Sequence, residues 1–249
     1  MPRISDISAK QEKEINYWRD SEDESPESDS IYNTVNKLSD APVLLDCLTR
    51  HRKQLDTKQR VLELGAGQGW AACIYKKLFP RAHVTVSDIS EYAVKSLPKW
   101  ERLFGVTIDN SYACKSYEIR ENDASLDLIF CFAAAHHFVA HKRTLLEISR
   151  VLKPRGTAIY FQEPATPRYL YPLAYWRVNR KRPAVPEDVL IVSELEKLAD
   201  QAGLDLRVDY YPQLIKRSPF EMLYYFFLSR IPILQRVLPC SANFVFTKS

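Results

Sequence analysis

The sequence predicts an α/β protein with an open, doubly wound and mostly parallel sheet. From about residue 58, short apolar runs alternate with stretches of helical length, the pattern of successive parallel βαβ units. The run 126–132 is apolar almost throughout, which is typical of a strand buried on both faces. Three of the six glycines fall within residues 65–69, directly after the first apolar run. Such sheets bind ligands beyond the carboxyl ends of their strands, so this glycine turn is predicted to lie in the binding crevice.

The individual elements follow from local pattern. Strands are predicted where short apolar or β-branched runs end at a turn, namely at 60–64, 83–87, 111–115, 126–132, 157–161, 206–211 and 243–247. Helices are predicted where the apolar period lengthens between these runs, namely at 70–79, 91–104, 142–152 and 192–202. Residues 1–30 are too charged to bury much apolar area, and we expect them to be mobile. The expected division is a flexible N-terminus and helical cap over 1–55, followed by the α/β domain over 56–249.

Composition narrows the function only slightly. The net charge of +4 neither demands nor excludes a polyanionic partner. The five cysteines lack metal-ligand spacing and are expected to be reduced thiols. With no secretory signal and no long apolar run, a cytoplasmic protein is expected.

The glycine turn carries a nearby carboxylate. Gly65, Gly67 and Gly69 alternate with other residues, and Glu63 stands two positions before the first of them. A nicotinamide oxidoreductase would need its third glycine at position 70, where this chain has Trp70. A neighbouring carboxylate repels a pyrophosphate, whereas it attracts a ligand with an ammonium group.

This segment resembles the first motif of class I S-adenosylmethionine-dependent methyltransferases, and the resemblance continues to about residue 165. It implies a Rossmann-like, seven-stranded sheet whose last strand is antiparallel, with S-adenosylmethionine as co-substrate and S-adenosylhomocysteine as product. By this resemblance Glu63 lies near the methionine amino group, and Gly65, Ala66 and Gly67 approach the methionine and ribose. Gly69 completes the motif.

The next strand ends supply the remaining cofactor contacts. Asp88 is expected to accept hydrogen bonds from both ribose hydroxyls; the alternative is a helix N-cap. The resemblance places Ile89 against adenine and Phe132 toward the methyl donor. The acid that the family usually has after the third strand is missing here, so either Ser116 or the backbone is expected to contact adenine.

The segment after residue 132 looks like the methyltransferase type 11 branch, which includes ubiquinone and menaquinone methyltransferases. In that branch a similar strand often ends in a His-His pair, here His136 and His137. A neutral histidine can accept the proton of a hydroxyl, phenol or amine, so both are predicted as catalytic. The alternative is that one orients the loop and the other is buried; Glu163 is a further candidate. No metal is expected, because adjacent histidines do not easily share an ion and no carboxylates recur nearby.

Three segments are candidates for the walls of an acceptor pocket. Tyr17 and Trp18 are expected to close it from the N-terminal side, and Tyr17 is also expected to contact the cofactor. The aromatic and basic stretch 168–182 would cap a substrate, stack RNA bases or form a packed loop. The apolar stretch 220–238, within an insertion over 213–240, would form a lid, a homodimer surface or a peripheral membrane contact.

The preferred function is methyl transfer to a small organic acceptor, at oxygen, nitrogen or carbon, by in-line displacement. A lipid or quinone at a membrane surface and an RNA remain as alternative acceptors. A scaffold that binds S-adenosylmethionine without catalysis is the alternative outside enzymes.

Overall fold

The computed structural model describes residues 4–180 and 184–249. The strands are β1 (Arg60–Leu64), β2 (His83–Asp88), β3 (Asn110–Ala113), β4 (Leu126–Phe132), β5 (Leu152–Thr166), β6 (Leu190–Ile191), β7 (Leu204–Tyr210) and β8 (Cys240–Lys248). The α-helices are α1 (Ile4–Asp20), α2 (Ile31–Arg50), α3 (Arg52–Leu55), α4 (Trp70–Leu78), α5 (Glu91–Lys95), α6 (Leu97–Phe104), α7 (His141–Val151), α8 (Tyr171–Asn179), α9 (Val192–Gln201), α10 (Pro219–Arg230) and α11 (Pro232–Val237). Two 3-10 turns are η1 (Ala135–His137) and η2 (Arg168–Leu170).

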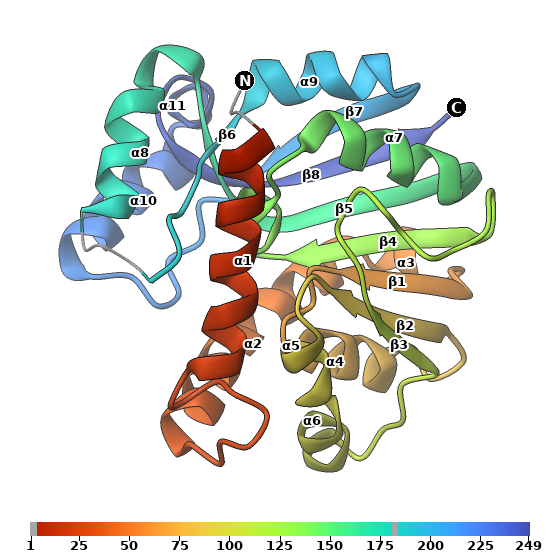
Figure 1. Cartoon of the computed structure of the whole chain (residues 1–249). Coiled ribbons are helices and arrows are strands. Elements are labelled where there is room, and N and C mark those ends of the chain that lie inside the picture. Colours follow the sequence, from red (N-terminus) through yellow and green to blue (C-terminus); the bar gives the residue numbers. More distant parts are fainter. Residues whose placement is uncertain (1–3, 181–183) are drawn as a thin grey trace.

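The strands form one twisted sheet in the order β3-β2-β1-β4-β5-β8-β7, with β6 beside β5 (Figure 1). The pairs are parallel except where β8 runs antiparallel to β5 and to β7. The predicted fold class is therefore confirmed, with β6 as an eighth strand in the described part of the chain. Strand order reverses between β1 and β4, which is where this class of sheet binds ligands.

The core lies on both faces of the sheet. Along β4, Leu128 and Phe130 join one buried cluster with residues of α2 and α4, whereas Ile129 and Cys131 join another with residues of α7 and α9. Successive side chains of a strand point to opposite faces. A nearly continuous apolar strand is thus the result of being covered on both sides, as the sequence predicted.

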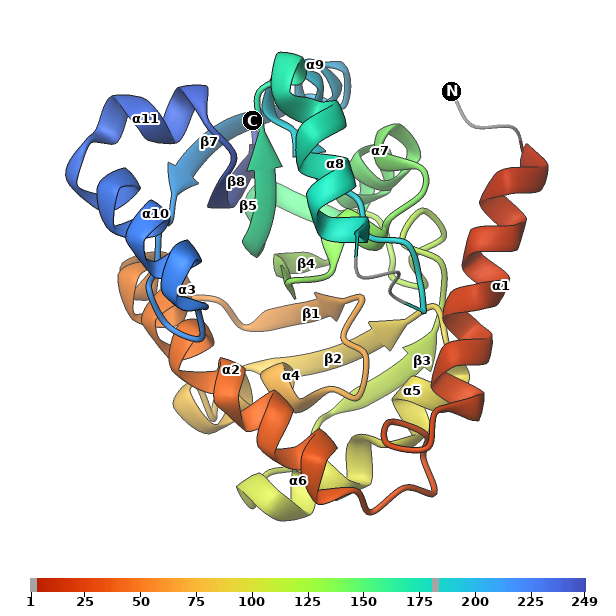
Figure 2. The same ribbon diagram turned by 90° about the vertical axis from the view of Figure 1, so that its left-hand side faces the viewer.

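The N-terminal segment differs from the prediction. Residues Ile4–Asp20 form helix α1 where the charged composition predicted a mobile segment. The two ribbon views show α1 standing beyond the carboxyl ends of the parallel strands (Figures 1 and 2). Charged composition does not exclude such a helix, because a few large contacts hold it: Trp18 is only 8% exposed with its ring over Gly67, and Gln11 is hydrogen-bonded to the Tyr117 hydroxyl.

Helices α8, α10 and α11 gather at the far side of the molecule from α6 (Figures 1 and 2). Arg177 of α8 pairs with Glu221 of α10 at 2.7 Å, and the Tyr169 hydroxyl donates to the Val237 carbonyl at 2.6 Å. The two stretches singled out in the sequence therefore form one helical unit; residues 181 and 182 of the first lie outside the described residues. Among the described helices, none combines the length and apolarity needed to cross a membrane.

Candidate active site

A cavity of about 370 Å³ opens at the carboxyl ends of β1, β2 and β4. This volume lies within the range of roughly 300–1,000 Å³ that is usual for small-molecule sites. Its walls come from α1, the glycine turn, the ends of β2 and β4, and the segment 184–187. Five stretches far apart in the sequence therefore enclose one space.

The glycine turn forms the floor of this cavity. Gly65 and Gly67 line it, and both have left-handed φ angles, +70° and +53°. A Cβ at Gly67 would lie 3.1 Å from the Trp18 ring, and one at Gly65 would lie 3.0 Å from the Phe138 ring. Both the backbone conformation and the close approach of aromatic rings therefore require glycine here.

Gly69 has a different reason for being glycine. It is the N-cap of α4 with φ +80°, and it does not line the cavity. A Cβ there would lie 2.6 Å from Leu97 Cδ1. Its place is explained by packing against α6, and its predicted part in cofactor binding stays a prediction.

Asp88 lies where the sequence predicted it, at the end of β2 and in the cavity wall. Its carboxylate accepts the Gly67 N–H at 2.8 Å and the Ser90 N–H at 2.9 Å. The N-cap of α5 is Ser90, whose side chain accepts from Ala93, so capping does not explain Asp88. Burial raises the pKa of the Asp88 carboxyl. The acid is held beside the glycine turn and facing the cavity.

Glu63 is directed toward α4, whereas the sequence predicted that it would lie near the methionine amino group. It is buried, it does not line the cavity, and its carboxylate accepts the Ala72 N–H of α4 at 2.7 Å. The first turn of a helix has unpaired N–H groups that favour a carboxylate. Burial raises the pKa of Glu63 well above its usual value. A contact between Glu63 and a methionine ammonium stays a prediction.

The other predicted cofactor residues are brought together. Tyr17, Ala66, Ile89, Ser116 and Phe132 all line the cavity. The Ser116 hydroxyl, however, is hydrogen-bonded to the Thr144 hydroxyl at 2.8 Å.

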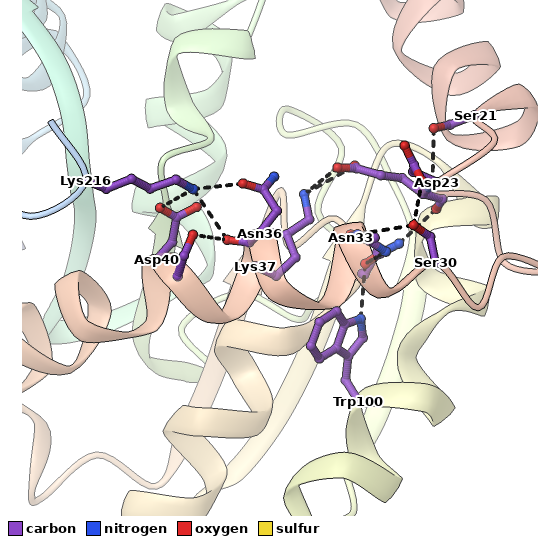
Figure 3. A network of polar contacts seen from close by, with 12 residues as sticks. Ser21, Asp23, Ser30, Asn33, Asn36, Lys37, Asp40, Trp100 and Lys216 are labelled. Atoms are coloured by element: carbon purple, nitrogen blue, oxygen red, sulfur yellow. Dashed lines mark hydrogen bonds and ion pairs between the residues drawn. The ribbon is translucent and has the colours of Figure 1, made fainter. Parts of the chain in front are cut away.

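Buried polar contacts hold the glycine turn from behind. The Gln68 side-chain oxygen accepts from Asn33 of α2 at 3.0 Å and from the Trp100 indole at 3.2 Å. Its amide nitrogen donates to the Glu24 carbonyl at 2.8 Å. Figure 3 shows Asn33 and Trp100 near each other beside the start of α2, with Ser30 and Lys37 at the same end of that helix. The N-terminal region is thus part of the site's framework.

The two histidines take different places. His137 lines the cavity, whereas His136 is buried behind it. A bulge in β5, where Gln162 has φ +58° and the register shifts, turns Glu163 into the interior. The fully buried Glu163 carboxylate accepts from the backbone N–H groups of Ala134 and Ala135 at 2.8 Å and contacts His136 Nδ1 at 2.8 Å. Glu163 therefore fixes the η1 turn and does not face the cavity.

The prediction that no carboxylates lie near the histidine pair is wrong. Glu187 lies 2.8 Å from His136 Nε2 and 3.5 Å from His137 Nε2, and Glu14 of α1 lies 3.6 Å from His137 Nδ1. Sequence reasoning missed Glu14 and Glu187 because they are far from the pair along the chain. For Glu14 one signal existed: it precedes the Tyr17–Trp18 pair by one helical turn.

These contacts separate the pKa values of the cluster. Burial opposes the charged form of His136, yet Glu163 and Glu187 raise its pKa to about 10. Burial and the neighbouring His136 lower the pKa of His137 to about 4. Burial, followed by Asp88, raises the pKa of Glu14 to about 7. At neutral pH, His136 is thus charged and His137 neutral.

Comparisons with known proteins show which domain and which fold this chain resembles. Residues 62–160 match a family model described as a methyltransferase domain. Geranyl diphosphate C-methyltransferase from Streptomyces coelicolor A3(2) superposes with a TM-score of 0.69 at 14% identity, over 96% of this chain and 98% of its own. A protein from Galdieria sulphuraria that is described as a sarcosine dimethylglycine methyltransferase superposes with a TM-score of 0.60 at 20% identity, over 90% of each chain. Phosphoethanolamine N-methyltransferase 2 from Haemonchus contortus gives 0.63 at 15%, over 94% of this chain and 59% of its own. No curated protein matches the sequence.

The sheet order and the glycine turn are those of the Rossmann-like α/β fold that these solved structures share. Residues 62–160 match the type 11 methyltransferase domain, as the resemblance seen in the sequence indicated.

Proposed function

We propose that the protein transfers a methyl group from S-adenosylmethionine to a small organic acceptor bound in the same cavity. The observation that carries this proposal is the continuity of the cavity, which joins Asp88 and the glycine turn at one end to Glu14, His137 and Glu187 at the other. The residues fit the adenosyl group: Asp88 offers a buried carboxylate to the ribose hydroxyls, and the turn offers close backbone at Gly65 and Gly67.

The reaction follows from this arrangement. The sulfonium methyl carbon is a strong electrophile, so holding the acceptor atom in line with the C–S bond supplies much of the acceleration. The acceptor's electron pair forms the new bond to the methyl carbon, and the C–S electrons return to sulfur. An O–H or N–H acceptor then loses its proton, and Glu14 and His137 offer accepting atoms at that end of the cavity. Of the two predicted catalytic histidines, we assign contact with the acceptor to His137 and positioning to His136.

The similar structures support a small acceptor. Their names describe methylation of geranyl diphosphate at carbon and of phosphoethanolamine at nitrogen. We therefore keep carbon and nitrogen, together with oxygen, as the candidate accepting atoms of the substrate.

Calorimetry with S-adenosylmethionine and with NAD tests the donor. Binding of the first and not of the second is expected, and the opposite result would overturn the proposal. A labelled-methyl transfer assay against extracts, with mass spectrometry of the product, then identifies the acceptor. Labelled RNA would instead support the RNA alternative, and cofactor binding without any labelled product would support the scaffold.

A second candidate is an acceptor taken from a membrane surface. The helical unit of α8, α10 and α11 exposes large apolar side chains, with Phe220 90%, Ile233 61% and Trp176 59% exposed. Residues 168–180 and 213–238 contain seven Lys or Arg and one acid, Glu221. Exposed aromatic residues interleaved with positive charge favour an anionic lipid interface.

Co-sedimentation with phosphatidylserine vesicles and with neutral phosphatidylcholine vesicles tests this candidate. We expect binding to the anionic vesicles that Phe220→Ser weakens, while Leu103→Ser on α6 leaves it unchanged. A dimer in solution with no vesicle binding would assign the surface to self-association.

A further inference from the structure

The described residues contain a cluster with the composition of a metal site at the acceptor end of the cavity. His136, His137 and Glu187 each offer a ligand atom, and these atoms lie within 4.8 Å of one another. The cluster joins the η1 turn to the segment before β6.

Both Nε2 atoms of the pair lie close to the same Glu187 oxygen, at 2.8 Å for His136 and 3.5 Å for His137. Ligand atoms bound at about 2.1 Å to one ion lie about 3.0–3.4 Å from one another. The two nitrogen–oxygen distances bracket this range, and all three ligand atoms lie within 4.8 Å of one another, so a closer approach of the two rings would bring them around one ion.

Adjacent histidines reach one point here because of the turn they occupy. In η1 the two rings lie close together, with centroids 4.3 Å apart and planes inclined by 42°. The turn thus brings the Nε2 atom of each ring to the same Glu187 carboxylate.

One of the two opposite nitrogens has a close carboxylate partner. His136 Nδ1 lies 2.8 Å from Glu163, whereas Glu14 lies 3.6 Å from His137 Nδ1, beyond hydrogen-bond distance. A metal-bound histidine nearly always directs its second ring nitrogen to a carboxylate or carbonyl, which fixes the tautomer and the ring orientation. Glu163 is itself held by the backbone of η1, so the arrangement for His136 is rigid.

The carboxylates around the two histidines also favour a bound cation. Three carboxylates, Glu14, Glu163 and Glu187, surround two imidazoles, and Lys10 is the cationic side chain that lines this part of the cavity. A divalent ion would displace the Nε2 proton of His136 and bring positive charge to this group of carboxylates in its place.

We propose that His136, His137 and Glu187 bind one divalent transition-metal ion. Two imidazoles and one carboxylate suit Zn²⁺, Mn²⁺ or Fe²⁺, whereas Mg²⁺ and Ca²⁺ favour all-oxygen sites. Since His137 and Glu187 line the cavity, the open positions of the ion face the acceptor. The acceptor class that follows is one with an oxygen that ligates the ion, a hydroxyl or a carboxylate. This acceptor class rests on the proposed methyl transfer; the ion site does not.

The test is titration of chelator-treated protein with Zn²⁺ and with Co²⁺, followed by calorimetry and by the visible absorption of Co²⁺. We expect one ion per chain, at least tenfold weaker binding in Glu187→Gln, and loss of the Co²⁺ bands in His137→Ala. Glu24→Gln, a carboxylate of the same cavity outside the cluster, is the matched control and should bind like the wild type.

Binding of S-adenosylmethionine is measured on each variant as the check of folding. Wild-type protein that binds the cofactor but no stoichiometric ion would overturn the metal site and leave the methyltransferase proposal standing. Equal ion affinity in Glu187→Gln and wild type would also overturn it. If the protein binds the ion but not S-adenosylmethionine, the metal site stands and the proposed function is overturned.

Discussion

The two ends of the cavity are built in different ways. The cofactor end comes from short contiguous motifs: the glycine turn after β1 and the acid that ends β2. The acceptor end is assembled from α1, η1, β5 and the segment before β6. In the sequence, Glu187 lies 24 residues after Glu163 and 173 residues after Glu14. The key contacts of this end, Glu14 with His137 and Glu187 with His136, connect parts of the chain that no local pattern links.

This difference explains what the sequence could predict. A βαβ unit brings its own strand ends together, so Gly65, Gly67 and Asp88 could be placed from spacing alone. The β5 bulge at Gln162 and the 3-10 turn at His136 are set by tertiary context, and with them the direction of Glu163. The charged composition of the N-terminus predicted a mobile segment, whereas residues Ile4–Asp20 form a helix whose Trp18 indole is buried.

The largest effect that separates the two ends is expected for Asp88→Ala. The variant removes a buried carboxylate predicted to accept two ribose hydroxyls, and hydrogen bonds to charged groups contribute roughly 1.5–3 kcal/mol each. We expect the Kd for S-adenosylmethionine to rise at least about 100-fold in calorimetry, because two such bonds contribute about 3 kcal/mol or more. His137→Ala, at the other end, should change it by less than about threefold. Similar losses in both variants would contradict the division of the cavity into two ends.

Within the cofactor end, Gly69→Ala should separate packing from binding. A Cβ at 2.6 Å from Leu97 and a left-handed φ together predict a loss of about 2 kcal/mol in the free energy of unfolding. Gly203→Ala is the matched control, because its φ is +68° but no atom lies within 4 Å of the added Cβ. It should lose about half as much, from the backbone alone.

Urea denaturation measures both glycine variants. In a calorimetric titration with S-adenosylmethionine, Gly69→Ala should retain the wild-type Kd, because Gly69 does not line the cavity. A large change in Kd with unchanged stability would return Gly69 to the cofactor site that the sequence predicted.

A smaller effect is expected where the N-terminal helix meets the cofactor end. Trp18→Ala removes the ring that lies over Gly67 and opens the cavity to water, so the Kd for S-adenosylmethionine should rise about tenfold. Trp18→Phe keeps an aromatic cover and should retain most of the affinity, because the buried Trp18 Nε1 has no hydrogen-bond partner among the described residues. Wild-type affinity in Trp18→Ala would show that α1 serves the acceptor end alone.

The smallest effect is expected for Ser116→Ala, although Ser116 occupies the position where the sequence predicted an adenine contact. Its hydroxyl is already paired with the Thr144 hydroxyl at 2.8 Å, on the side of α7. A net hydrogen bond of this kind contributes about 1 kcal/mol, and removing it acts on the folded protein more than on the ligand. The Kd should therefore change by less than about twofold, while Ile89→Ala, which removes an apolar wall, should weaken binding more. A rise above fivefold in Ser116→Ala, at unchanged stability, would mean that the hydroxyl leaves Thr144 when the cofactor binds. In that case even the cofactor end would depend on a contact that forms only with its ligand, and the contrast between the two ends would be one of degree.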